Sequence, residues 1–331
     1  MIDKRYAFSL VALALILWTA GSADARGQYA AWQKQWPSTD FSKHSVPLDE
    51  IVGGGPPKDG IPSIDRPVFA PLSDIEGLAD AEPVITVEIK GYTRAYPLRI
   101  LIWHEIVNDE IAGVPVAVTY CPLCDSAIVF DRRVDGQVLE FGTTGKVRHA
   151  DLVMYDRQTE SWWQQFVGEA IVGEMTGAVL KMIPARVESV ARFRERGPRG
   201  LVLVPSRMGL RQYGASPYAD YDTRRRPLPH FFQGAYPKGI APMARVVRIG
   251  RHAWPLKRLR KEQRIEHGNL ILTWAAGQNS ALDEREIIRG RDIGNVVVQR
   301  QTENGLEDAV YDVTFAFAFN AFYPDGTLHS R

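Results

Sequence analysis

Short extended segments separated by turn signals constrain this chain more than any other feature of its sequence. From Ile61 onward, β-branched or alternating runs of a strand's length follow one another, at residues 84–89, 114–120, 127–130 and 152–155. Turn-forming residues punctuate this region, at residues 135–136, 142–145 and 173. A helix is predicted at residues 97–107, where Pro97 suits the first helical position. The pattern predicts an α+β fold that is mainly β.

A weak internal repeat subdivides the chain further. Three pairs of segments match in the same order, namely residues 95–98 with 253–256, residues 119–128 with 273–282, and residues 155–156 with 311–312. We therefore predict two related β-rich units, at about residues 83–185 and 243–331, that arose by internal duplication. The second unit has Ala275 and Gln278 where the first has cysteines, so the scaffold is not expected to depend on the thiols.

Composition places the boundaries between these regions. Glycine, proline and polar residues are frequent between residues 26 and 60, while proline, tyrosine and arginine are frequent between residues 204 and 242. The predicted regions are a signal peptide (1–25), an irregular N-terminal arm (26–60), a β-rich unit with both cysteines (61–203), a connection (204–242) and a second, cysteine-free β-rich unit (243–331).

The first residues are typical of a secretory signal peptide. Lys4 and Arg5 precede an apolar run at residues 6–18, and Ala-Asp-Ala at residues 23–25 is a cleavage site of the small-x-small type. An uncleaved anchor helix is the alternative. No later run approaches the roughly 20 apolar residues that a membrane-spanning helix needs. We predict export to the periplasm, and the net charge of +1 gives no reason to expect nucleic acid as a partner.

The two cysteines, Cys121 and Cys124, form a Cys-Pro-Leu-Cys motif between two predicted strands. Three functions remain open for them. A structural disulfide across so short a loop would contribute roughly 2 kcal/mol, against about 3 kcal/mol for a 15-residue loop. A redox-active pair would exchange disulfides with a partner protein, but its strand–turn–strand context differs from that of a thioredoxin site. A metal knuckle would present both sulfur atoms to one ion.

The metal site is the leading hypothesis, and it requires further ligands. His104, His149 and Met154 are the candidates. With two thiolates they form a soft ligand set, which favours copper and leaves zinc open. Each also has a structural interpretation. His104 lies on an apolar helical stripe and fits a core histidine, and its neighbour Glu105 is expected to face solvent. His149 fits a surface loop, and Met154 fits the core.

A second candidate site follows the predicted strand at residues 152–155. Asp156, Arg157 and Trp162 could line a ligand pocket, with Arg157 holding an anion and the tryptophan forming a wall. A turn closed by the Asp–Arg pair and packed indole rings explains the same residues equally well. The glycine-containing segment 141–145 lacks the lysine and the helix of a phosphate-binding loop, so a hairpin turn is predicted there.

Several segments together resemble a known family, namely residues 61–65, 94–98, 103–109, 119–124 and 152–163. The chain is similar, from about Ile61 to Asp222, to exported bacterial and archaeal proteins that are catalogued as a domain of unknown function. Their hallmark is a Tyr-Cys-Pro-Leu-Cys box, found here at residues 120–124. The resemblance implies an exported, β-rich protein with a central pair of thiols. It transfers no catalytic residues, so whether the protein is an enzyme stays open.

Overall fold

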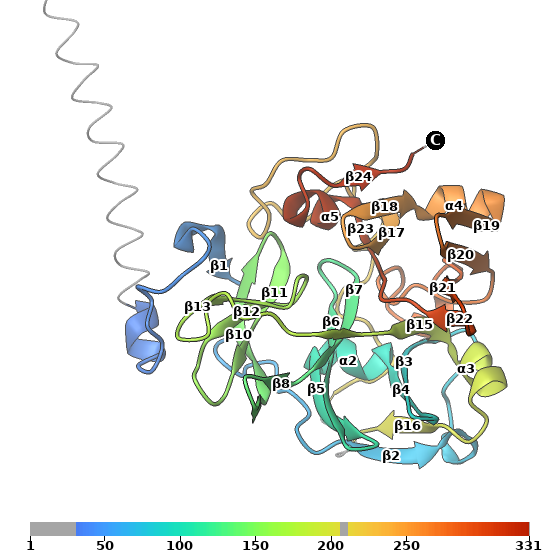
Figure 1. The fold of residues 1–331 in the computed structure, drawn as a ribbon, viewed down its shortest axis with the longest axis horizontal. Helices are drawn as coiled ribbons and strands as arrows, with labels where there is room; N and C mark the ends of the chain where they lie inside the picture. The colour runs from blue at the N-terminus through green and yellow to red at the C-terminus, as the bar shows by residue number, and fades with distance from the viewer. Residues whose placement is uncertain (1–30, 206–210, 331) are drawn as a thin grey trace, which may run out of the picture.

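The strands of this protein form five small sheets arranged in a propeller-like ring (Figure 1). The computed structural model describes residues 31–205 and 211–330, so the predicted signal peptide lies outside the described residues. Strands account for 41% of the chain and helices for 14%, which confirms the prediction of a mainly β fold. No helix in the described part of the chain has both the length and the apolar character needed to cross a bilayer.

Three sheets come from residues 51–204, which we call the first half of the chain. The first has the order β1 (Ile51–Gly53), β10 (Phe141–Arg148), β11 (Asp151–Asp156), β12 (Trp162–Gln164) and β13 (Glu169–Val172). The second has the order β14 (Met182–Ile183), β7 (Ser126–Asp131), β6 (Val114–Cys121) and β5 (Ile106–Ile111). The third has the order β15 (Ala185–Ser189), β3 (Pro83–Ile89), β4 (Tyr92–Pro97), β16 (Leu201–Val204) and β2 (Val68–Pro71).

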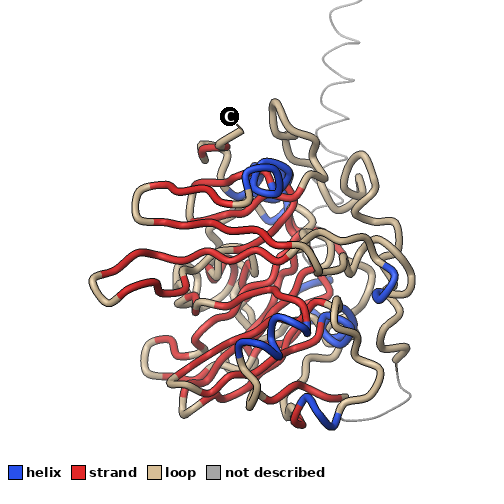
Figure 2. The backbone as a smooth tube through the Cα atoms, turned by 90° about the vertical axis from the view of Figure 1, so that its right-hand side faces the viewer, coloured by secondary structure: helices blue, strands red, loops and turns tan. Residues whose placement is uncertain are grey.

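Two more sheets come from residues 245–328, which we call the second half of the chain. One has the order β23 (Asp312–Phe315), β17 (Arg245–Ile249), β18 (His252–Pro255) and β24 (Thr327–Leu328). The other has the order β19 (Arg264–His267), β20 (Leu270–Ala275), β21 (Asn295–Thr302) and β22 (Gly305–Asp308). A small hairpin joins β8 (Arg133–Val134) to β9 (Gln137–Val138) across the predicted turn at residues 135–136. Figure 2 shows the strands stacked through the molecule, with long loops along one side.

Short helices connect the strands. Besides the helical residues 31–35, the α-helices in the described part of the chain are α2 (Leu98–His104), α3 (Val190–Arg196), α4 (Leu256–Glu262) and α5 (Ala316–Phe322), and the 3₁₀ turns are η1 (Leu48–Glu50), η2 (Leu72–Asp74) and η3 (Ile287–Arg289). Helix α2 is shorter than predicted. Pro97 caps it from an extended conformation, and Glu105 ends it with a φ of 59° while donating its N–H to the Leu101 carbonyl. Strand β5 then begins at Ile106.

One sheet from each half of the chain has the same strand order and the same directions of pairing. The order β15-β3-β4-β16 matches β23-β17-β18-β24, and in both cases the last pairing is parallel while the others are antiparallel. A seven-residue helix follows the first strand of each order, α3 after β15 and α5 after β23. The hairpins β3–β4 and β17–β18 likewise lead into α2 and α4, and then into the antiparallel pairs β5–β6 and β19–β20.

This topology agrees with only part of the predicted repeat. The segments 95–98 and 253–256 lie at equivalent places, because each ends a hairpin and starts a helix. The two segments 119–128 and 273–282 are equivalent only up to the ends of β6 and β20. Beyond β20, residues 276–294 separate it from β21, so Ser280 does not occupy the place of Ser126. Residues 155–156 and 311–312 belong to different parts of the topology, in β11 and at the start of β23.

The N-terminal arm packs on the first sheet. Trp32, Trp36 and Phe41 are buried around Trp162, with ring centroids 5.1–5.3 Å from the tryptophan. Strand β1 in the same arm pairs with β10. Within the described part of residues 204–242, no helix or strand occurs between β16 and β17.

The predicted hairpin turn at residues 141–145 is wrong. These residues lie inside strand β10, where the register shifts between Thr143 and Lys146 as in a β-bulge. Gly145 adopts a φ of +71°, and a Cβ atom there would lie 2.0 Å from the carbonyl oxygen of Pro56. The glycine is needed because the arm's backbone crosses the bulge at this point, a tertiary contact that local sequence does not reveal.

Candidate functional site

The two cysteines lie at the turn between β6 and β7. Cys121 is the last residue of β6 and pairs with Ser126, so residues 122–125 form the turn. Asp125 ends it with a φ of 53°. Both cysteines are buried and free, and no disulfide joins them. The strand–turn–strand context predicted from the sequence is therefore present.

A second tight turn faces the first. Arg148 and Asp151 pair across the β10–β11 hairpin, so His149 and Ala150 alone form its turn. Both have positive φ, 53° and 61°, as a type I′ turn requires. Non-glycine residues in this conformation are strained. The turn places the Ala150 carbonyl oxygen 3.3 Å from the Cys124 sulfur and 3.7 Å from the Cys121 sulfur.

Asp151, the first residue of β11, completes a cluster with the two cysteines. The two sulfur atoms and one carboxylate oxygen lie within 4.8 Å of one another, and all three residues are buried. The Asp151 Oδ2 atom accepts hydrogen bonds from Gln164 Nε2 at 2.6 Å and from the Phe166 N–H at 2.9 Å. Within the described residues no other partner satisfies its buried Oδ1 atom, although the Cys121 thiol lies close enough to the carboxyl group to lower its pKa by hydrogen bonding. A buried carboxylate oxygen without a partner is costly.

A cavity of about 220 Å³ opens onto this cluster. Cys121 lines it, together with Glu105, Lys146 and Tyr218. Apolar residues supply most of the remaining wall, from both the arm and the connection, namely Pro56, Ile61, Leu228 and Phe231. The arm and the connection thus enclose a space next to the Cys121 sulfur.

Burial controls the protonation of the acidic groups here. It raises the pKa of Asp151 to about 7, and burial together with the charge of Asp151 raises the pKa of Glu105 to about 8. Burial also raises the pKa of Cys121 and, more strongly, that of Cys124. Burial also lowers the pKa of Lys146, which lines the same cavity, to about 8. The centre is thus rich in acidic groups whose ionisation burial opposes.

Backbone contacts with the rest of the molecule hold the cysteine turn in place. The Cys124 carbonyl accepts hydrogen bonds from Thr314 Oγ1 at 2.7 Å and from the Phe315 N–H at 3.0 Å, both in β23. The Tyr221 hydroxyl, in the connection, donates to the Leu123 carbonyl at 3.0 Å. The second half of the chain therefore positions the thiols, although it contributes no sulfur atom.

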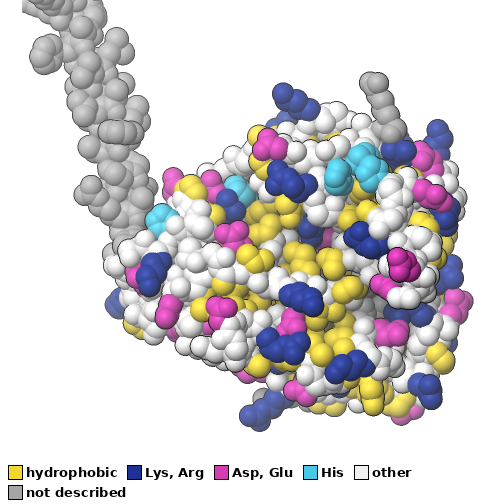
Figure 3. Space-filling model, in the orientation of Figure 1, with side chains coloured by type: hydrophobic (Ala, Val, Ile, Leu, Met, Phe, Trp, Pro, Cys, Tyr) yellow, Lys and Arg dark blue, Asp and Glu magenta, His cyan; other side chains and the backbone are white. Residues whose placement is uncertain are grey.

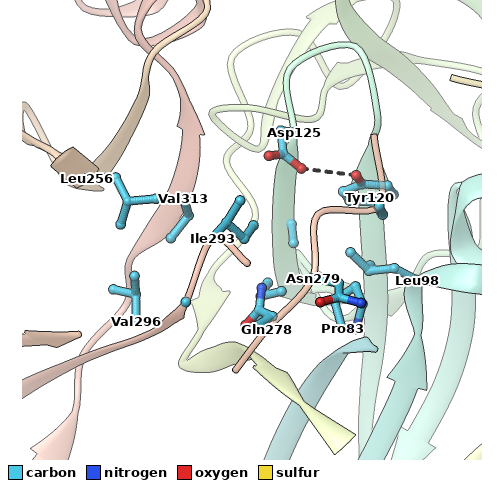
Figure 4. Close-up of a pocket in the computed structure, with 14 residues that line it drawn as sticks. Pro83, Leu98, Tyr120, Asp125, Leu256, Gln278, Asn279, Ile293, Val296 and Val313 are labelled. Atoms are coloured by element: carbon cyan, nitrogen blue, oxygen red, sulfur yellow. Dashed lines mark hydrogen bonds between the residues drawn. The ribbon is translucent and has the colours of Figure 1, made fainter. Parts of the chain in front are cut away.

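Charged groups link the same turn to the second half. Asp125 accepts from the Tyr120 hydroxyl at 3.0 Å and forms an ion pair with Arg245 at 2.6 Å. Arg245 also pairs with the buried Asp222 at 2.8 Å. Figure 4 shows Tyr120 and Asp125 joined on one side of a small cavity, with Leu256, Val296 and Val313 of the second half on the other side.

His104 is engaged outside the cysteine cluster. Its Nδ1 atom lies 2.7 Å from the Pro62 carbonyl oxygen, and its Nε2 atom lies 2.8 Å from the Tyr213 hydroxyl. Both ring nitrogens therefore have hydrogen-bond partners. Its neighbour Glu105 does not face solvent as expected, because the positive φ that ends helix α2 turns this residue into the protein, where it lines the cavity.

His149 and Met154 make other contacts in the protein. His149 occupies the β10–β11 turn, but its Nε2 atom lies 3.3 Å from the Glu50 carboxylate, and its ring packs against Phe232 and Phe322. Burial and the charge of Arg148 lower the pKa of His149 to about 4. Met154 is fully buried in the main hydrophobic core. Among the predicted metal ligands, the structure brings together Cys121 and Cys124.

The three predicted ligand-binding residues are engaged within the protein. Asp156 is buried and accepts hydrogen bonds from Thr159 and from Trp163 Nε1 at 2.8 Å. Trp162 packs among the rings of the arm. Arg157 pairs with the carboxylates of three residues, namely Asp59, Asp65 and Glu140. The packed rings agree with the structural alternative, whereas Arg157 pairs with these three residues and not with Asp156.

Sequence reasoning missed Asp151, Glu105 and Lys146. An acidic residue at the start of a predicted strand gives a weak signal for Asp151, because such positions are usually exposed. Lys146 directly follows the segment mistaken for a turn, residues 141–145. The burial of Glu105 follows from its own positive φ at the end of helix α2, which the sequence does not indicate. Tertiary packing places Asp151 beside the sulfurs and puts Glu105 and Lys146 in the wall of the cavity, and single-sequence patterns carry little information about such packing.

Comparison with known proteins agrees with the resemblance seen in the sequence. No curated protein and no solved structure matches the chain. A family model described as "Protein of unknown function (DUF3179)" matches residues 58–326, which is most of the chain and more than the segment that carried the resemblance. The protein therefore belongs to the DUF3179 family.

Proposed function

We propose that Cys121, Cys124 and Asp151 bind a transition-metal ion at the centre of an exported protein. One observation carries the proposal: two buried sulfur atoms and a buried carboxylate lie within 4.8 Å of one another, and one oxygen of that carboxylate has no hydrogen-bond partner. Thiolate and carboxylate are both metal ligands in proteins. A bound ion would satisfy the unpaired oxygen, and the two sulfurs would exchange their thiol contacts with the Ala150 carbonyl for bonds to the ion.

Electrostatics favour a metal over metal-free thiol exchange. Disulfide exchange needs a thiolate, but burial raises the pKa of both cysteines above its usual range, and the nearby acids oppose ionisation further. A cation would reverse this effect, because a coordinated thiol loses its proton. In addition, both cysteines are buried, and of the two only Cys121 lines the cavity.

The ligands favour copper or zinc, depending on the charge of Asp151. Two thiolates alone suit Cu(I), as predicted from the sequence. An ionised Asp151 adds a hard oxygen ligand and a third negative charge, which suits divalent zinc better. The cavity beside Cys121 leaves room for a further ligand or a small substrate. The site therefore fits binding and delivery of the ion, or chemistry at an open coordination position.

Metal analysis of protein purified anaerobically from the periplasm tests the proposal. We expect about one equivalent of copper or zinc per chain and two titratable thiols after the metal is removed. The Cys121→Ser and Cys124→Ser variants should each lose the metal. Metal identity in the wild-type protein separates copper from zinc. Periplasmic fractionation of the full-length chain, compared with a chain that lacks residues 1–25, tests export.

Two results would contradict the metal site. Metal-free protein whose cysteines exchange with glutathione at a measurable rate would support a thiol–disulfide oxidoreductase instead. Metal-free protein in which replacing both cysteines by serine changes only stability would support a structural pair in a binding or assembly module.

We also propose that the two halves arose by internal duplication. The support is the shared strand order with its one parallel pairing, and helices of equal length at equivalent places. Gly200 and Gly326 add a local detail. A Cβ atom at either position would lie 2.6 Å from the Cζ atom of a phenylalanine, Phe193 or Phe319, in the preceding helix. Significant superposition of residues 83–121 on 245–275 in an experimental structure would test this.

A further inference from the structure

We propose a second metal site on the surface of the second half, formed by His252, His267 and His329 and suited to a divalent transition-metal ion. The three residues come from separate segments: the start of β18, the end of β19 and the residue after β24. One ring nitrogen from each lies within 4.8 Å of the others. Figure 3 shows histidine side chains gathered near the end of the described chain.

The rings are close and ordered by packing. His252 Nδ1 lies 3.0 Å from His329 Nε2, and the ring centroids of His267 and His329 are 4.8 Å apart. Trp254 stacks on His329 with centroids 4.5 Å apart and an interplanar angle of 10°. A rigid aromatic surface of this kind limits the rotation of the imidazole and lowers the cost of holding it for a ligand.

The backbone also fixes the three segments. The His329 N–H donates to the Ala253 carbonyl at 2.8 Å, which continues the parallel pairing of β18 with β24. His267 pairs with Leu270 across the two-residue turn of the β19–β20 hairpin. The Arg258 guanidinium donates to the His329 carbonyl at 3.1 Å. Strand pairing therefore fixes the backbone positions of the three histidines.

The corresponding place in the first half holds an ion pair. Arg94 in β4 and His252 in β18 each lie opposite the first residue of the following parallel strand, β16 or β24. Asp109 and His267 are each the fourth residue of the next strand, β5 or β19. In the first half, Arg94 and Asp109 neutralise each other. In the second half, imidazoles replace both, and a cation is the group that several imidazoles bind together.

Ligand chemistry defines the class of ion. Three imidazole nitrogens suit Zn²⁺, Cu²⁺ or Ni²⁺, and they do not suit Mg²⁺ or Ca²⁺, which prefer oxygen. His252 and His267 are exposed and His329 is half-buried. A fourth position would therefore face solvent, open to water or to a ligand from another molecule.

Titration with Cu²⁺ alone tests the site, using protein without a histidine tag in the Cys121→Ser/Cys124→Ser background. This background separates the test from the thiol site, so failure of one proposal leaves the other standing. We expect one Cu²⁺ per chain, with nitrogen hyperfine structure in the electron paramagnetic resonance spectrum and displacement only by a large excess of Zn²⁺. His267→Ala and His329→Ala should each weaken binding at least about tenfold.

His44→Ala is the matched control, because His44 is exposed and distant in the chain, and it should bind Cu²⁺ like the parent. Thermal melts verify that each variant is folded. Should the serine background fail to fold, the same substitutions in the wild-type chain should remove one equivalent of Cu²⁺. Unchanged binding in both alanine variants, or a spectrum without nitrogen coupling, would overturn the proposal.

Discussion

Asp151 differs from the other buried aspartate of its strand in what its oxygens contact. Asp156 is equally buried, at the other end of β11, and its carboxylate accepts hydrogen bonds from Thr159 and Trp163. Asp151 keeps one oxygen unpaired, and that carboxylate lies next to the cysteine sulfurs. The two residues therefore form a natural pair for testing whether the carboxylate binds metal.

Replacing Asp151 by asparagine should weaken metal binding at least about tenfold, because the amide supplies no negative charge to the ion. Asp156→Asn should leave metal affinity unchanged in the folded protein. His104→Ala should also leave it unchanged, since both of its ring nitrogens bond to Pro62 and Tyr213. Competition with a chromophoric chelator measures all three. A loss of metal in His104→Ala, with retention in Asp151→Asn, would restore the histidine as a ligand and exclude the aspartate.

Lys146 should make stability depend on pH. Its pKa is about 8 in the folded protein, against an ordinary 10.5, because burial opposes the charge. Between these values Lys146 binds more protons in the unfolded chain than in the folded protein, so its contribution to the free energy of unfolding should rise as pH increases from about 8 to 10.5. Lys146→Met lacks this contribution, so the wild-type protein should gain stability relative to the variant over this range, and the variant should be the more stable protein at pH 7. Urea denaturation at several pH values in the presence of a chelator measures the effect. A rise of equal size in both proteins would show that other groups cause it.

The β10 strand joins the arm to the site through its bulge. Gly145 in this bulge lines the cavity and lies under the backbone of Pro56. Gly136, in the β8–β9 turn, has a similar φ of +79°, but nothing lies within 4 Å of a Cβ atom placed there. The two glycines thus share a backbone conformation and differ in tertiary contact.

Gly136→Ala should cost about 1 kcal/mol, the usual cost of a left-handed conformation for alanine. Gly145→Ala should cost about 1–3 kcal/mol more, because the methyl group overlaps the Pro56 carbonyl. Equilibrium urea denaturation of the two variants gives the difference. Equal costs would mean that the arm moves away from β10 without loss of stability.

A buried arginine forms one of the polar contacts between the two halves of the molecule. Arg245, at the start of β17, is buried and pairs with Asp125 of the cysteine turn and with Asp222 of the connection. The exposed Arg264 pairs with Glu266 in the same half, as a surface ion pair. Only the first arginine neutralises buried carboxylates, so it couples the position of the thiols to the stability of the whole ring.

Arg245→Met should therefore lower the free energy of unfolding by about 3 kcal/mol, because it leaves a buried carboxylate short of a partner. Arg264→Met should change it by less than about 1 kcal/mol. Thermal and urea unfolding provide the comparison. The junction would be unimportant if both variants unfolded at the same urea concentration.

Local patterns determined much of this protein. The four predicted strands all lie within observed strands, and the helix after Pro97 begins within one residue of its predicted start. The cysteine pair sits at the predicted strand–turn–strand site. These features follow from residue periodicity, proline geometry and turn chemistry, which act over a few neighbouring residues.

Only the tertiary structure decided what surrounds the cysteines. Asp151 faces the sulfurs because a two-residue turn brings β11 against the β6–β7 turn, and Glu105 lines the cavity because one positive φ ends α2. His252, His267 and His329 meet through pairings between strands far apart in the chain. Such contacts depend on how sheets pack and pair, so the identity of a residue and its near neighbours did not reveal them.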